Sequence, residues 1–459
     1  MKSIPGIKTW ETGDNKRIVH HWRNVKPAGQ FGAVSLEPGR TPDVQVSSFL
    51  SWEEVGRWYE ELERSKRVPS QEIKAKADEL TKGVNTEGEK VEALYNFAAK
   101  KVKYISLVSL GIGGYEPHPA SETLRNLYGD CKDKVALLSA LLESEGLHAS
   151  SLLISADRKL DLEVPSPWPF DHVITMLELG KNRIWLDPSP AVLPLGMLAP
   201  SLRGKEGLLM PWDGVPHFEK TPTETPLANR WTEEVTGRIG EDGTLEAAVQ
   251  ITARGDAELG LRQAFIGPVE AAWPATVEGV VKGIDRKTDK VSDVKIGDPT
   301  DTSKAFTLSF RFSRPHFASF AKGEAKFRLP LAGIDLPSAE EEGVMDTAGG
   351  WHRVEAEPVR LGLPGERSYG VKLELPLGCS PELPGSVFLK QAGLTYSGTY
   401  NSDGSSLTAE RDLTLTKDHL AANFRVEYAV FREKVLADVN RILSARVTDS
   451  RAEETKNPM

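Results

Sequence analysis

The chain has 459 residues, 39% of them hydrophobic and 27% charged, and its net charge is -9 at pH 7. This composition is typical of a globular protein of about three domains, and no apolar run approaches the roughly 18 residues that cross a membrane. The acidic balance argues against a nucleic-acid partner, because phosphate binding needs a basic surface.

Residues 1 to about 45 alternate short extended pieces with turns rich in proline and glycine. Because this stretch is too short to fold alone, we expect the remnant of an N-terminal β domain or a strand pair packed on the next domain. No apolar segment precedes the charged residues from Asp14 onward, so no secretory signal is expected. As written, the chain would stay in the cytoplasm.

Three helices are predicted next. The first begins after Ser51, with Glu53 and Glu54 in its first turn and an apolar stripe that includes Tyr59. Two more are expected over 70–82 and 87–101, because apolar residues recur there at helical spacing.

A strand over 103–107, a loop over 111–119 and a short helix over 120–127 lead to the centre of the chain. The loop lacks the glycine spacing and the lysine of a phosphate-binding loop. It either lines a cleft or is an ordinary long loop.

The stretch 128–142 predicts a turn, a cysteine and a helix. Gly129 suits a tight turn, Asp130 is a favoured N-cap, and Asp133 occupies the capping-box position three residues on. Cys131 then falls at the first helical position, where free N–H groups and two neighbouring lysines, Lys132 and Lys134, favour a thiolate. A lone cysteine is more often a small buried hydrophobe. Both interpretations stay open at this point.

The second cysteine, Cys379, lies far away in sequence among prolines and glycine, without a base nearby, and is expected to be structural. Two distant cysteines predict neither a disulfide framework nor a Cys-x-x-Cys metal or redox motif.

A strand over 149–155, a proline-rich loop and a hairpin follow the central helix. If Gly180 and Lys181 form the hairpin loop, Asp187 falls on the same face as His172 and diagonal to it. Diagonal neighbours have Cα atoms about 7 to 8 Å apart, close enough for a carboxylate to reach an imidazole. Cysteine catalysis needs a base and a group that orients it, so His172 and Asp187 are candidates for these roles. The alternative is a structural histidine.

Beyond Pro190 a proline-rich connector is expected, followed from about residue 230 by a mainly β pattern. Hairpins are predicted around 241–243 and 402–404. The pattern also predicts helices at about 255–285 and a last amphipathic helix at about 422–444.

Three motifs resemble the transglutaminase-like superfamily of papain-type cysteine folds. They are Tyr128-Gly129-Asp130-Cys131-Lys132-Asp133-Lys134, Phe170-Asp171-His172-Val173-Ile174 and Trp185-Leu186-Asp187-Pro188. The closer resemblance is to bacterial multidomain members in which a β domain of unknown function precedes the core and a β-rich region follows it. The resemblance implies Cys131 as nucleophile, His172 as general base and acid, and Asp187 as the orienting residue. Such members are usually exported, which implies a periplasmic or other extracytoplasmic location instead of the cytoplasm.

The expected fold class is α+β: a transglutaminase-like core with its central helix packed on an antiparallel sheet, then a β-rich, sandwich-like region ending in a helix. The expected domains are a β remnant over 1–45, the core over 46–225, the β-rich region over 226–448 and a disordered tail over 449–459.

The predicted function is thiol-dependent acyl transfer or hydrolysis at a peptide or glutamine-type amide bond of a protein or peptide substrate. The alternative is a non-catalytic module that binds peptide or cell-envelope partners. No cofactor or metal is expected, and a metal hydrolase is disfavoured because the chain has no His-Glu-x-x-His motif. The acceptor and the oligomeric state are not predicted.

Overall fold

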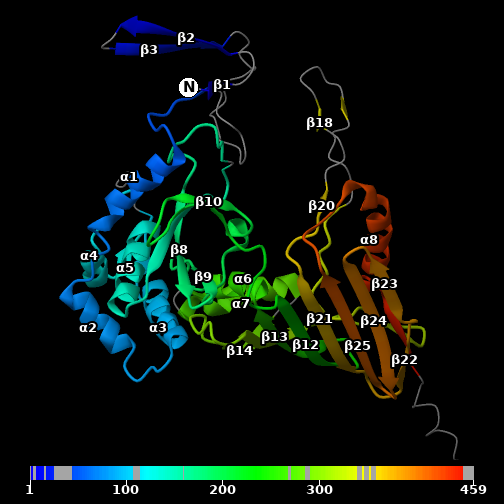
Figure 1. The fold of residues 1–459 in the computed structure, drawn as a ribbon. Helices are drawn as coiled ribbons and strands as arrows, with labels where there is room; N and C mark the ends of the chain where they lie inside the picture. Colours follow the sequence, from blue (N-terminus) through cyan, green and yellow to red (C-terminus); the bar gives the residue numbers. More distant parts are fainter. Residues whose placement is uncertain are drawn as a thin grey trace, which may run out of the picture. The chain divides into compact units, whose positions relative to one another are not determined.

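The structure is a computed structural model (Figure 1) that describes residues 2–3, 7–14, 17–24, 44–106, 114–158, 160–266, 270–284, 290–338, 344–345, 351–352 and 358–447. The chain divides into two compact units, Met1–Pro226 and Leu227–Met459. Among the residues that the structure describes, no helix is both long enough and apolar enough to span a membrane.

The N-terminal stretch contains short strand pairs. Strands β2 (Ile7–Asp14) and β3 (Arg17–Asn24) form an antiparallel hairpin, and β1 (Lys2–Ser3) pairs with β4 (Val44–Gln45). Residues 25–43 of the predicted β remnant lie outside the described residues, as does the predicted tail over 449–459.

Three helices of the first unit begin at a hydroxyl side chain that caps them. Ser51, Ser70 and Thr86 each accept a hydrogen bond from the backbone N–H three residues later, which satisfies one of the free donors at a helix start. The helices of this unit are α1 (Trp52–Arg64), α2 (Gln71–Leu80), α3 (Glu87–Lys100), α4 (Ala120–Asn126) and α5 (Cys131–Ser144).

The main sheet of the first unit has the strand order β11-β10-β7-β8-β9, with antiparallel neighbours. Its strands are β7 (Ala149–Ile154), β8 (His172–Leu179), β9 (Asn182–Leu186), β10 (Glu206–Met210) and β11 (His217–Lys220). Helix α5 packs against β7 and β8, and α1 packs against β10 and β11 (Figure 1). The residues of α5 from Lys132 to Leu142 are all buried. The predicted central helix on an antiparallel sheet is thereby confirmed.

A short parallel pair stands directly before α5. Strand β5 (Lys103–Tyr104) pairs with β6 (Tyr128–Gly129), which places Tyr104 opposite Gly129. The strand predicted over 103–107 is thus only two residues long in the described part, and residues 107–113 lie outside it.

The second unit is built on two sheets. The larger has the order β14-β15-β13-β12-β21-β25-β24-β23 and the smaller the order β16-β17-β27-β22. The elements of the larger sheet are β12 (Arg230–Ile239), β13 (Leu245–Arg254), β14 (Lys290–Ile296), β15 (Phe306–Arg314), β21 (Gly365–Glu374), β23 (Val387–Gln391), β24 (Leu394–Asp403) and β25 (Ser406–Leu415). Those of the smaller sheet are β16 (Ser319–Ala321), β17 (Glu324–Phe327), β22 (Cys379–Glu382) and β27 (Leu443–Val447).

Helices and two-residue strands complete this unit. The helices are α6 (Asp256–Ile266), α7 (Trp273–Ile284) and α8 (Arg425–Val439), and the short pairs join β18 (Val344–Met345) to β19 (Trp351–His352) and β20 (Val359–Arg360) to β26 (His419–Leu420). Helix α8 is shorter than the predicted 422–444, because a 3-10 turn precedes it and β27 begins at Leu443.

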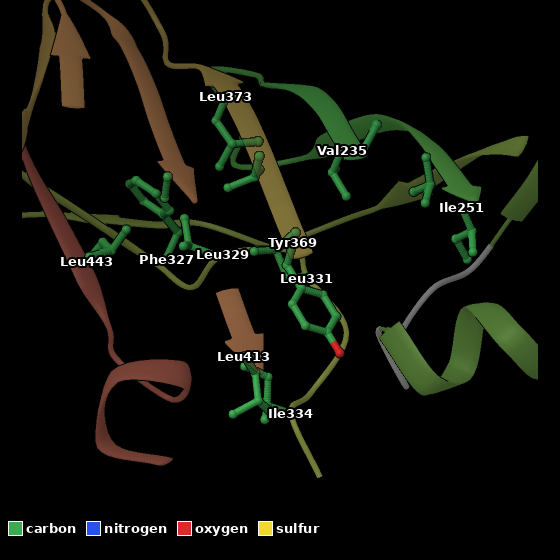
Figure 2. Packing of buried hydrophobic residues seen from close by; sticks show 14 of the residues in the cluster. Val235, Ile251, Phe327, Leu329, Leu331, Ile334, Tyr369, Leu373, Leu413 and Leu443 are labelled. Atoms are coloured by element: carbon green, nitrogen blue, oxygen red, sulfur yellow. The ribbon is translucent and has the colours of Figure 1, made fainter. Parts of the chain in front are cut away.

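One hydrophobic core joins both sheets of the second unit. Along β12, β13 and β25 buried and exposed residues alternate, as expected of strands with one covered face. Figure 2 shows side chains of these strands, such as Val235 and Leu413, in one cluster with Phe327 of β17 and Leu443 of β27. The β-rich character predicted for this region is confirmed.

Candidate active site

A reciprocal capping box sets the start of α5. Asp130 accepts a hydrogen bond from the backbone N–H of Asp133 at 3.4 Å, and the Asp133 carboxylate accepts one from the N–H of Asp130 at 3.1 Å. Cys131 is therefore the first residue of the helix, as the sequence predicted, and its side chain is partly exposed.

Gly129 is needed here for space and not for a turn. A Cβ on Gly129 would lie 2.6 Å from the Cβ of Asp133, because the Asp133 side chain folds back over this position. The left-handed residue of the turn is Leu127, with φ 54°. The interpretation of Gly129 as the turn residue was therefore wrong, while the need for a glycine was right.

The two lysines beside Cys131 already have partners. Lys132 forms a buried ion pair with Asp130. The Nζ of Lys134 donates to the backbone carbonyls of Ala99 and Val102 at 3.1 and 2.7 Å, and burial lowers the pKa of Lys134 to about 8. The expectation that both lysines add free positive charge at the thiol was therefore too simple.

The hairpin has the predicted register. Leu179 pairs with Asn182 and Thr175 with Leu186, so the chain reaches Asp187 directly after β9, on the side of His172. The His172 Nε2 atom lies 2.9 Å from Oδ2 of Asp187, whose side chain is almost fully buried. The other carboxylate oxygen of Asp187 accepts a hydrogen bond from the N–H of Ser189 at 2.9 Å.

His172 and Asp187 form a charge-stabilised pair. Burial by itself lowers the pKa of His172, but the charge and hydrogen bond of Asp187 and a hydrogen bond with Cys131 outweigh it and hold that pKa well above 6.5. Burial acts to raise the pKa of Asp187, and the charge of His172 with the hydrogen bonds from His172 and Ser189 lowers it overall. The imidazole of His172 is thus paired with a buried carboxylate.

These side chains open onto a cleft of about 470 Å³. Cys131 and His172 line it together with aromatic rings, among them Tyr59, Tyr104 and Trp168. Gly114 and Tyr115, from the middle of the predicted loop over 111–119, also line the cleft, while Gly111, Ile112 and Gly113 lie outside the described residues.

The segment that carries Trp168 is held from two sides. Arg158 donates to the carbonyl of Trp168 at 2.7 Å and stacks its guanidinium 4.9 Å from the ring centre, and the Tyr115 hydroxyl donates to the carbonyl of Pro167 at 2.8 Å. Trp168 keeps 55% of its surface exposed. It is therefore a fixed but accessible ring on the rim of the cleft.

Sequence reasoning missed the aromatic lining. Tyr59 belongs to an apolar stripe of α1, and this stripe predicts that the residue is buried but not that it lines a cleft. Tyr104 lies in a short predicted strand, which does not indicate a role in a cleft either. The exposed Trp168 beside prolines offered a signal, since a large aromatic ring in a loop is typical of binding surfaces. Cys379 is buried in the second unit, at the start of β22, and burial raises the pKa of its thiol.

Comparisons with known proteins bear on the family and the fold. Residues 74–153, which include Cys131, match the model of the transglutaminase-like superfamily. No curated protein matched the sequence. The chain is similar in structure to "a putative protease" from Parabacteroides distasonis ATCC 8503, with a TM-score of 0.52 and 13% identity over 96% of this chain and 68% of that one.

A second solved structure, "a putative cysteine protease" from Cytophaga hutchinsonii, is 18% identical over 40% of this chain and 62% of that one, with a TM-score of 0.22. At these identities the likeness to the Parabacteroides protein speaks for the fold alone. The matched residues and the packing of α5 on its sheet identify the first unit of this chain as the carrier of a transglutaminase-like core.

Proposed function

We propose that this protein uses Cys131 to hydrolyse or transfer the acyl group of a peptide or glutamine-type amide. The observation that carries the proposal is the imidazole of His172, which is hydrogen-bonded to Asp187 and lines the same open cleft as Cys131. A nucleophile, a base and an orienting carboxylate in this order are what thioester chemistry requires.

The first step forms a thioester. The Cys131 sulfur, its proton taken by His172, attacks the amide carbon; the C–N bond then breaks, and the imidazolium returns the proton to the leaving amine. In the second step water or an amine gives a proton to His172 and attacks the thioester, which releases the product and the thiolate. The thiolate recovers its proton from the imidazolium, so the enzyme ends as it began.

Two features stabilise the charged intermediates of this mechanism. The backbone N–H of Cys131 is one of the free donors at the start of α5 and is available to the oxyanion. Asp187 stabilises the imidazolium that forms in each step, since its buried carboxylate faces Nε2 at 2.9 Å. Because the similar Parabacteroides protein is described as "a putative protease", peptide hydrolysis is the reaction to test first.

The test compares wild type with Cys131→Ala and, as a matched control, Cys379→Ala. Each is incubated with a panel of peptide anilides, with and without an excess of a primary alkyl amine. We expect release of the aniline that depends on Cys131 and not on Cys379, and a product ratio that distinguishes water from amine as acceptor. Equal turnover in Cys131→Ala would contradict the proposal. Binding of peptides by wild type without any turnover would instead favour a non-catalytic binding module.

A further inference from the structure

Tyr59 brings a polar atom to the cleft from an otherwise apolar wall. Its ring belongs to a cluster that joins α1 to the sheet and to α5, with Val55, Leu153 and Phe170 among its members. Only 2% of the residue is exposed, yet it lines the same cleft as Cys131.

The hydroxyl of Tyr59 has no hydrogen-bond partner among the residues that the structure describes. Tyr95, Tyr396 and Tyr428, which are buried to the same degree, each donate to a carbonyl or carboxylate oxygen at 2.6 to 3.0 Å. The Tyr59 oxygen is also not one of the fully buried side-chain atoms that lack a hydrogen-bond partner in the described part of the chain. It is therefore accessible from the cleft that Tyr59 lines. An acceptor bound in the cleft would therefore find an available donor in this hydroxyl.

The hydroxyl of Tyr59 stays protonated and can therefore donate a hydrogen bond. Burial above all, and then the electrostatic influence of Glu63, Cys131 and Asp130, raise the pKa of Tyr59 well above 10. The hydroxyl therefore keeps its proton at neutral pH. Cys131, the first residue of α5, packs against the same cluster as Tyr59.

We propose that the Tyr59 hydroxyl donates a hydrogen bond to the carbonyl oxygen of the bound acyl group and, together with the backbone N–H of Cys131, holds the oxyanion. Of the two polar groups of an amide, the carbonyl oxygen accepts hydrogen bonds, and it gains negative charge during attack by the sulfur. This inference rests on the proposed function, and it names a catalytic residue outside the three sequence motifs.

The experiment replaces Tyr59 with Phe, which removes the hydroxyl and keeps the ring in its cluster. Turnover of the peptide anilide is measured together with the rate at which iodoacetamide alkylates Cys131, a reaction that forms no oxyanion. We expect Tyr59→Phe to lower kcat about 100-fold, as other losses of one oxyanion donor do, with KM and the alkylation rate changed less than about twofold. Tyr128→Phe, whose ring is outside the cleft, is the control that should match wild type in all three quantities.

Four outcomes would overturn the inference. Tyr59→Phe turnover within about threefold of wild type would show that the hydroxyl is not needed. An equal fall of turnover and alkylation would show that Tyr59 only supports the structure around Cys131. A loss in Tyr104→Phe without one in Tyr59→Phe would assign the donor to Tyr104. Absence of turnover in wild type would overturn the proposed function as well, and so is distinguishable from the other results.

Discussion

The contact between His172 and Asp187 allows a quantitative test through Asp187→Asn. The amide keeps the size of the side chain but removes the charge that faces Nε2 at 2.9 Å, while the burial that lowers the pKa of His172 remains. A hydrogen bond between charged groups contributes about 1.5 to 3 kcal/mol, which corresponds to about one to two pKa units. The pKa of His172 should fall by this amount from its raised value.

The same free energy predicts the kinetic effect. If the lost interaction stabilises the imidazolium in the transition state, kcat/KM should fall about 10- to 150-fold. The alkaline limb of the pH profile should move to lower pH by about one to two units, because the imidazolium is lost earlier. Asp171→Asn is the matched control, since Asp171 is the neighbouring cleft carboxylate and bonds Ser155 and the N–H of Ala156.

The effect on stability has a defined sign. The raised pKa of His172 stabilises the folded state fully below about pH 6.5, and this stabilisation is lost as pH rises through the folded-state pKa. The lowered pKa of Asp187 stabilises the folded state fully above about pH 3.8, and this stabilisation is lost as pH falls. The difference in unfolding free energy between wild type and Asp187→Asn should therefore be largest between about pH 4 and 6.5. An unmoved alkaline limb, with kcat/KM no lower than in Asp171→Asn, would refute an orienting role for Asp187.

Other predictions concern single residues. Iodoacetamide should alkylate Cys131 faster than Cys379, because Cys131 lines the cleft whereas burial raises the pKa of the Cys379 thiol; mass spectrometry of the native protein would show equal labelling if this is wrong. Gly129→Ala should destabilise the protein by about 1 to 3 kcal/mol in urea unfolding and slow alkylation of Cys131, since the new Cβ displaces Asp133; an unchanged midpoint would contradict this. Burial raises the pKa of Glu233 to about 7, so the free energy of unfolding should fall as pH rises from about 4.5 to 7. Glu233→Gln should therefore raise the free energy of unfolding by up to about 3 kcal/mol at pH 8 and leave it unchanged at pH 4. Identical urea midpoints of Glu233→Gln and wild type at pH 8 would count against it.

The parts of the candidate site that the sequence could predict are those fixed by local rules. A capping box places Cys131 at a helix start, and a two-residue hairpin loop determines that Asp187 falls on the face of His172. Both rules act over a few residues, so the local sequence pattern is enough to predict their outcome. The further assignment of roles came from resemblance to a family.

Tyr59 could not be predicted, because its helical spacing is the same as that of core residues. Only the packing of α1 beside α5 on the sheet decides that its hydroxyl meets a cleft and not a carbonyl. The smaller sheet of the second unit was missed for a related reason: β17 and β27 pair over more than a hundred residues of sequence, and no local signal reports such a partner.

The buried Lys134 joins segments around the candidate site and so opposes the local unfolding of any one of them. Its ammonium group on α5 binds the carbonyls of Ala99 and Val102 at the end of α3, and it lies 3.5 Å from the carbonyl of Ser189 in the turn that holds Asp187. Separating any one of these segments would leave a buried cation with fewer acceptors, which is costly. The three segments should therefore form one cooperative unit, whose amide protons exchange together and only in rare, large openings. On heating, this part of the protein should lose the candidate site in one step, without a preceding phase of local fraying around Asp187.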